Sequence, residues 1–286
     1  MSVTSLKSNG YSSHFFPIGK APLPREHGAW VMLYAPVVIA LLALHAFPTA
    51  KIFALLAAIT GLFLVRNVFG LLVRKRGGSG SAFWFILYSA LFLSGALPLL
   101  FTQQRYLFIY IGLTAVILFG LHTILLMVPG KRRLDRSEWG EILASGALAL
   151  TGPAAAVAAQ GEINRLAITL WAASTLYFTS GIFFVKMLLA AAKERGEIGR
   201  EARLRLGSNC LIYHAFLGML LCSGFFLLPL RTAVIALIAI LPVEFRMLKG
   251  WMQLSRRPPP LRKVGRGETL YLLWFAAMLS IALSHP

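Results

Sequence analysis

The 286-residue sequence is poor in charge, in acidic residues and in cysteine. Charged residues make up 13% of the chain, and only 10 Asp and Glu accompany 28 Lys and Arg. An ordinary soluble domain has about 25% charged residues, so this class is excluded. The two cysteines, Cys210 and Cys222, share one apolar run without CxxC spacing. A disulfide framework is therefore excluded, and we expect buried thiols.

Hydrophobic residues take the place of the missing charge. They make up 58% of the chain, and the mean hydropathy is +0.73. These values predict a polytopic membrane protein. The formal net charge of +18 would favour nucleic-acid binding in a soluble protein. Here the basic residues lie between apolar runs, where membrane topology and anionic lipids account for them, so we expect membrane lipids and no nucleic acid as partners.

Nine apolar runs are long enough to cross a hydrocarbon core of about 30 Å. They predict an all-α transmembrane helix bundle that forms a single domain over residues 25–286, after a cytoplasmic N-terminal arm over residues 1–24. The arm contains no long apolar segment, so we expect no cleavable signal peptide. The runs are Trp30–Phe47, Ile52–Val73, Ala82–Phe101, Tyr106–Val128, Trp139–Ala159, Leu166–Ala192, Asn209–Leu230, Thr232–Met252 and Thr269–Ser284.

The basic residues alternate between the two sides of the predicted bundle. On one side lie 24 of the 28 Lys and Arg, and the other four occur one apiece in the alternate loops. The positive-inside rule then places the N-terminus in the cytoplasm and the C-terminus outside, in a bacterial cytoplasmic (inner) membrane. Nine of the ten acids lie on the same side, Glu162 being the exception. We interpret this asymmetry as binding or chemistry at the cytoplasmic interface, although positive-inside charge alone explains part of it.

The first candidate site lies where the arm meets the first apolar run. Arg25, Glu26 and His27 are separated from Trp30 by two small residues. Burying such groups without partners costs several kcal/mol, so we expect them to pair with each other or with other helices. The alternative is that Arg25 is a positive-inside anchor and Trp30 an interfacial aromatic. On the first interpretation Arg25 and Glu26 bind a ligand, and His27 is a candidate acid or base.

Two further runs carry ionisable side chains inside the membrane. Arg66, beside Asn67, lies about two turns inside the second run, where an arginine rarely faces lipid, so we expect a buried partner. Glu141 enters a segment of Leu, Ala and Gly, and its carboxylate needs a basic partner. Arg66, Arg25 and Lys186 are the candidates for that partner.

The sixth run has a polar stripe that ends in a lysine. Thr175, Thr179 and Lys186 fall on one helical face. Lys186 either extends to the cytoplasmic interface or pairs with an acid. Tyr177 adds a hydroxyl on a neighbouring face and is a candidate ligand contact, although intramembrane hydroxyls often serve only helix packing.

The seventh run begins with several polar residues. Cys210 and His214 are four residues apart, but two ligands without a third do not make a metal site, so we predict no metal. Asn209 with Tyr213 forms an equally good polar face, and Asn209 and His214 are kept as candidate ligand contacts. Histidines near the cytoplasmic third of their helices leave haem or quinone contact open. Scattered histidines are more often packing residues, so we predict no cofactor.

Three stretches carry a resemblance to a known family. They are Pro-Arg-Glu-His-Gly-Ala-Trp30, the segment from Glu141 to Pro153, and Phe183-Phe-Val-Lys-Met187 before a basic loop. They resemble the YwiC-like family of bacterial membrane proteins over most of the chain, and Arg-Glu-His-Gly-Ala-Trp is the most specific part. The resemblance implies no catalytic residue, because no activity is attached to that family.

A more distant resemblance is to the UbiA prenyltransferase superfamily. It rests on nine helices, a cytoplasmic N-terminus and polar clusters at the cytoplasmic ends of the second and sixth runs. That superfamily binds magnesium diphosphate through two aspartate-rich motifs, but residues 66–76 and 185–195 contain no aspartate here. Magnesium prefers oxygen ligands, commonly carboxylates. The resemblance thus implies a shared arrangement without metal-dependent prenyl transfer.

The predicted function is binding of an amphipathic or isoprenoid-like ligand in a cavity open to the cytoplasm. Arg66 and Lys186 would contact an anionic head group, and His27 or Glu141 would be the acid or base of any reaction. We also expect Arg66, Glu141, Lys186 and Asn209 to converge with residues 25–27 into one polar cluster. Glu26 or Glu141 would pair with Arg66 or Lys186 there. The alternatives are a small-solute transporter and a non-catalytic assembly or scaffold protein of a respiratory complex, and the oligomeric state is left open.

Overall fold

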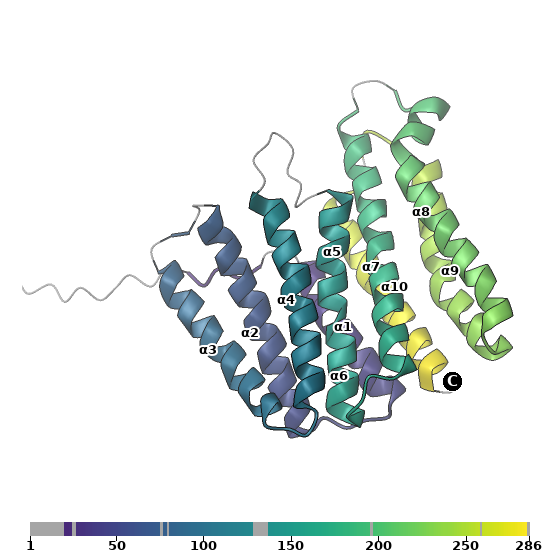
Figure 1. Ribbon diagram of the computed structural model, residues 1–286. Coiled ribbons are helices and arrows are strands. Elements are labelled where there is room, and N and C mark those ends of the chain that lie inside the picture. The colour runs from purple at the N-terminus through teal and green to yellow at the C-terminus, as the bar shows by residue number, and fades with distance from the viewer. Residues whose placement is uncertain are drawn as a thin grey trace, which may run out of the picture.

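The computed structural model describes residues 20–24, 27–74, 77–78, 80–127, 137–194, 197–257 and 259–284. This part of the chain forms ten α-helices and no strand (Figure 1). The helices are α1 His27–Ala43, α2 Ala50–Val73, α3 Ser81–Leu100, α4 Arg105–Met127, α5 Glu138–Ala149, α6 Thr151–Gln160, α7 Arg165–Ala192, α8 Arg200–Leu227, α9 Leu230–Met252 and α10 Leu261–Ser284.

Helices α5 and α6 form one continuous rod. Leu150, between them, has helical backbone angles of φ −60° and ψ −16°. The hydroxyl of Thr151 lies 2.9 Å from the carbonyl oxygen of Leu148 in the same rod and 2.8 Å from that of Leu33 in α1. This rod and the eight other helices of the described residues correspond one to one with the nine predicted runs.

Seven of these helices are long and apolar enough to cross a membrane. They are α2, α3, α4, the α5–α6 rod, α7, α8 and α10. Helix α1 has only 17 residues, and α9 carries Glu244, Arg246 and Lys249 in its second half. The prediction of an all-α polytopic transmembrane helix bundle is confirmed.

Successive rods run in opposite directions. Helices α2, α4, α7 and α9 end at one end of the bundle, the upper end in Figure 1, and the C-terminal helix α10 ends at the lower end. We call the upper end the basic end, because Lys193, Arg203, Arg256 and Lys263 lie at or beyond the helix termini there. This alternation is the one that the basic loops predicted, and the assignment of the basic end to the cytoplasm stays a prediction.

Helix α7 lies at the centre of the bundle. It packs against α5 and α6 on one face and against α8 and α9 on another, while α1 packs against α6 and α10. The largest core cluster joins these helices, with Ile39, Leu170 and Phe275 almost completely buried. Helix α7 therefore separates two regions of the bundle, one built from α2 to α6 and the other from α8 to α10.

Helices α2 and α3 form the closest pair in the bundle. A Cβ atom at Gly61 would overlap the backbone of Phe92, and one at Gly95 would overlap the backbone of Ala54 and Ala58. Glycine at these two positions lets the helix backbones approach, as small residues do in membrane proteins. Helix α4 instead packs mainly against α5 and leaves most of its surface exposed. Space remains between α4 and the α2–α3 pair.

Two helices begin well before the predicted membrane runs. Helix α8 begins at Arg200 instead of Asn209, and α10 begins at Leu261 instead of Thr269. Apolar runs mark the part of a helix that lies in lipid, whereas Arg, Lys, Glu and Leu continue a helix readily in water. The earlier start of α10 brings Glu268 into a helix, where it forms an ion pair with Arg246 of α9.

Candidate functional site

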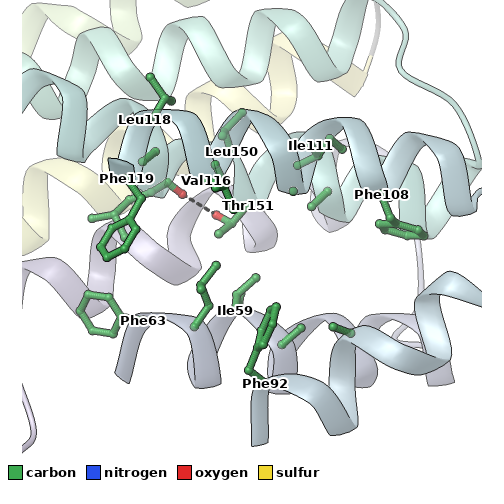
Figure 2. A pocket seen from close by; sticks show the side chains of 18 of the residues that line it. Ile59, Phe63, Phe92, Phe108, Ile111, Val116, Leu118, Phe119, Leu150 and Thr151 are labelled. Carbon is green, nitrogen blue, oxygen red and sulfur yellow. Dashed lines mark hydrogen bonds between the residues drawn. The ribbon is translucent and has the colours of Figure 1, made fainter. Parts of the chain in front are cut away.

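An apolar cavity of about 420 Å³ lies between α4 and the helices α2, α3, α5 and α6. Figure 2 shows Ile59 and Phe63 of α2 and Phe92 of α3 on one side, with Ile111 and Phe119 of α4 on the other. Its volume falls within the range of about 300–1,000 Å³ that is usual for small-molecule sites. The cavity is therefore large enough for a ligand.

The sequence of α4 explains the apolar wall. Phe108, Ile111, Ala115, Phe119 and His122 all line the cavity. They recur at steps of three or four residues, so they occupy one face of the helix. Fourteen residues at 1.5 Å each separate the first from the last, so the face is about 21 Å long. It is apolar along its length and becomes polar only at its last position.

The polar end of the cavity is formed by Arg66 of α2 and His122 of α4. Nη2 of Arg66 lies 3.3 Å from Nδ1 and 3.4 Å from Nε2 of His122. The guanidinium carbon also lies 5.8 Å from the centre of the Phe119 ring, within the range of a cation–π contact. Arg66 is about two turns from the basic end of α2, and His122 is about one and a half turns from that of α4. The cavity thus has one cationic end and one apolar end.

Thr151 is the third residue with a polar side chain in the cavity wall. Its hydroxyl is placed to donate to the carbonyl oxygens of Leu33 or Leu148, and a dashed line in Figure 2 marks a bond of this hydroxyl. A hydroxyl has only one proton to donate, and either of these carbonyl groups can accept it. Recognition of a charged group in the cavity therefore falls to Arg66 and His122.

The N-terminal arm is held against the same region of α2. The side-chain amide of Asn67 donates to the carbonyl oxygen of Pro22 at 2.5 Å, and the indole of Trp30 donates to that of Pro24 at 3.4 Å. The amide nitrogen of Asn67 thus has a backbone partner in the arm, and contact of Asn67 with a ligand stays a prediction. Arg25 and Glu26 lie outside the described residues, as does the side chain of His27.

The predicted pairing of Glu141 with Lys186 is confirmed. Nζ of Lys186 lies 3.7 Å from Oε2 of Glu141, which joins α7 to α5. The side chains are 21% and 36% exposed. Glu141 is one turn closer to the basic end than Ala144, which lines the cavity. The ion pair therefore lies beyond the cationic end of the cavity and outside its wall.

A second polar cluster lies on the opposite face of α7, and most of its members were not predicted. Arg246 of α9 forms an ion pair with Glu268 of α10, and its guanidinium carbon lies 4.4 Å from the centre of the Phe184 ring. Nδ1 of His214 lies 3.0 Å from Oε1 of Glu244. Arg246 is only 7% exposed and His214 only 2%. We call these four ionisable residues the α8–α10 cluster.

Two of the predicted site residues lie in this second region and not in the cavity wall. His214 is part of the α8–α10 cluster, and Tyr177 stacks on Phe275 of α10 at 4.1 Å between ring centres. Asn209 is exposed on α8 while its neighbour Cys210 is buried, and its convergence with Arg66, Glu141 and Lys186 stays a prediction. A helix turns by about 100° per residue, so adjacent residues face different surroundings.

The sequence contains a signal for the members of the α8–α10 cluster that were not predicted. Glu268 is a lone acid directly before an apolar run, and Glu244 and Arg246 interrupt the end of another run. Such intramembrane charges need partners as much as Arg66 does. Among the described residues, no three His, Cys, Asp or Glu side chains come close enough together to hold a metal ion.

The part of the chain that contains the cavity matches a known family model. Residues 23–156, just under half of the chain, match the family model described as YwiC-like protein. The match covers two of the three resembling stretches, and Phe183–Met187 lies outside it. No curated protein and no solved structure matches the chain, so the UbiA-like arrangement stays a prediction. All residues that line the cavity fall within residues 23–156, and this cavity-forming region is similar to the YwiC-like family.

Proposed function

We propose that this membrane protein binds an amphipathic lipid, isoprenoid-like or acyl, in the cavity between α4 and α2. The tail would lie along the apolar face of α4, and an anionic head group would contact Arg66. The single observation behind the proposal is an apolar cavity with its charge at one end. On the predicted topology, in a bacterial cytoplasmic membrane, this end opens toward the cytoplasm.

The energetics indicate which part of such a ligand is recognised. Moving a lipid tail from the bilayer into an apolar cavity exchanges one apolar environment for another, so hydrophobic burial contributes little. A hydrogen bond to a charged group contributes about 1.5–3 kcal/mol, which is about a 10- to 100-fold difference in affinity. Selectivity would therefore come from the head group at Arg66 and from the shape of the cavity.

Lys186 is proposed as a second cation for the head group. It already faces the carboxylate of Glu141 at 3.7 Å, and an anionic group arriving beyond Ala144 would compete with that carboxylate. The acid–base roles of His27 and Glu141 stay predictions. Binding is accordingly the proposed function.

Native mass spectrometry of the gently purified protein tests this function. Wild-type protein should carry an amphipathic anionic lipid, and Arg66→Gln should reduce the bound fraction about 10-fold or more. Arg231→Gln is the matched control, because Arg231 is exposed at the opposite end of the bundle. Equal occupancy in the two variants, or a wild-type protein that carries no lipid, would refute the proposal. Solute flux in proteoliposomes that depends on Glu141 and Lys186 would instead support a transporter.

A further inference from the structure

The cavity of the proposed lipid site has a defined length between its cationic end and its far end. Its wall on α4 extends from His122 to Phe108, which is about 21 Å, and its wall on α2 from Arg66 to Leu55, which is about 17 Å. Carbon–carbon bonds of about 1.5 Å at an angle of about 111° advance an extended chain by about 1.25 Å per carbon. The two walls therefore match a tail of about 13–17 carbons.

The volume of the cavity agrees with this length. A methylene group is about as large as a water molecule, whose share of liquid volume is about 30 Å³, so the volume of about 420 Å³ corresponds to about 14 methylene groups. A second tail of the same length would need about twice this volume. The cavity thus has room for one tail and is too small for two.

The far end of the cavity is bounded by the connection between α3 and α4. This connection consists of residues 101–104 and lies at the lower end of the bundle in Figure 1. The cavity is lined by Leu99 and Leu100 just before it and by Phe108 just after it. A tail that begins at Arg66 and follows the apolar face of α4 therefore ends at this connection.

The connection is fixed to the helices around the cavity. Nζ of Lys51, in the first turn of α2, donates to Oε1 of Gln104 at 3.0 Å. Gly161, at the end of α6, lies against the same side chain, since a Cβ atom there would be 3.0 Å from Nε2 of Gln104. The hydroxyl of Thr102 donates to the carbonyl oxygen of Leu99 at 2.7 Å. A tail that continued along α4 beyond Phe108 would have to displace these contacts.

We propose that the cavity selects a single-chain anionic lipid with a tail of about 13–17 carbons. This selection rests on the proposed function, because it concerns the same cavity and the same head-group contact at Arg66. A shorter tail leaves part of the cavity unfilled, and a longer tail meets the α3–α4 connection, so binding weakens in both directions. Two-chain phospholipids and long polyprenyl lipids do not fit.

Native mass spectrometry of the full-length protein in nanodiscs of phosphatidylcholine tests the length limit. The probe is an equimolar mixture of one dialkyl phosphate with straight-chain alkyl phosphates that are shorter than, within and longer than the range of about 13–17 carbons. The bound fraction should be largest within this range. It should be lower by about 10-fold or more for the dialkyl phosphate and for the longest chains.

The outcomes separate the length limit from the proposed function. Arg66→Gln should weaken the binding of all chain lengths alike, so this variant reports on the head-group contact. A bound fraction that rises steadily with chain length would overturn the length limit and leave the head-group contact intact. A dialkyl phosphate that binds as well as the single chains would do the same. If no alkyl phosphate of any length binds, both proposals are refuted.

Two variants that lose the same phenyl ring locate the limit. Phe108→Ala enlarges the far end of the cavity and should move the preferred tail length upward by about two carbons or more. Phe226→Ala is the matched control and should leave it unchanged, because Phe226 is 90% exposed on α8 and does not line the cavity. An equal preferred length in the two variants would overturn the role of the α3–α4 connection. If Phe108→Ala does not fold, the chain-length series with the wild-type protein decides.

Discussion

The two regions on either side of α7 differ in what surrounds their charged side chains. In the α2–α6 region the cation of Arg66 lies at one end of an apolar cavity, and His122 and Phe119 of α4 contact it. In the α8–α10 region the charged groups meet each other at the centre of a helix interface. The first arrangement leaves volume beside a charge, and the second fills the volume with side chains.

This difference separates the proposed lipid site from a cluster of charges that joins helices. A ligand tail needs space, which the loose packing of α4 against the α2–α3 pair provides. The α8–α10 cluster instead joins three helices through close contacts between charged side chains. A charged side chain inside the membrane therefore does not identify a ligand site by itself. A cavity beside the charge is also needed.

The largest expected effect is on stability, from breaking the buried ion pair. Arg246→Met should lower the free energy of unfolding by about 3–5 kcal/mol, because it leaves Glu268 without its cation. The measurement is unfolding of the purified protein in bicelles. The double variant Arg246→Met with Glu268→Leu should recover most of the loss, because it removes both charges. A single-variant loss no larger than that of exposed Arg231→Met would contradict the role of the pair.

A much smaller effect on stability is expected from breaking the ion pair of Glu141 and Lys186 near the cavity. Glu141 and Lys186 are both partly exposed, so their coupling should be below about 1 kcal/mol. A double-mutant cycle with Glu141→Gln and Lys186→Gln measures this coupling apart from their other contacts. A coupling above about 2 kcal/mol would show that this pair is as deeply desolvated as the α8–α10 cluster. It would contradict the difference between the two regions.

The sequence was sufficient for the features that depend on composition and on local spacing. Nine apolar runs predicted the nine rods, and the isolation of Glu141 in an apolar segment predicted a basic partner, which is Lys186. Both follow from rules that act within one helix or on one charge. The positions of helix ends were less accurate, since α10 begins eight residues earlier than the apolar run.

The remaining features depend on which helices pack together, and no spacing in the sequence encodes that. Arg66 and His122 lie 56 positions apart, and Arg246 and Glu268 lie 22 apart. Their pairing results from the position of α4 across the cavity from α2 and from the packing of α9 against α10. The second pair was not predicted, because Arg246 near the end of one run and Glu268 directly before another were counted only for topology. A search for a partner for every lone acid next to an apolar run would have found it.

Filling the cavity between α4 and α2 with a side chain tests most directly whether this cavity holds a lipid. A Cβ atom at Gly112 or at Gly120, both on α4, would meet no atom within 4 Å. Only Gly112 lines the cavity. The two variants Gly112→Phe and Gly120→Phe therefore add the same side chain to the same helix, in one case into the cavity.

Native mass spectrometry of these two variants should show bound lipid in wild type and in Gly120→Phe. Lipid should be reduced about 10-fold or more in Gly112→Phe, with unfolding temperatures that are alike in the two variants. The reason is that a phenyl ring in the cavity occupies the volume that the lipid tail needs. Equal lipid occupancy in Gly112→Phe and Gly120→Phe would contradict the account.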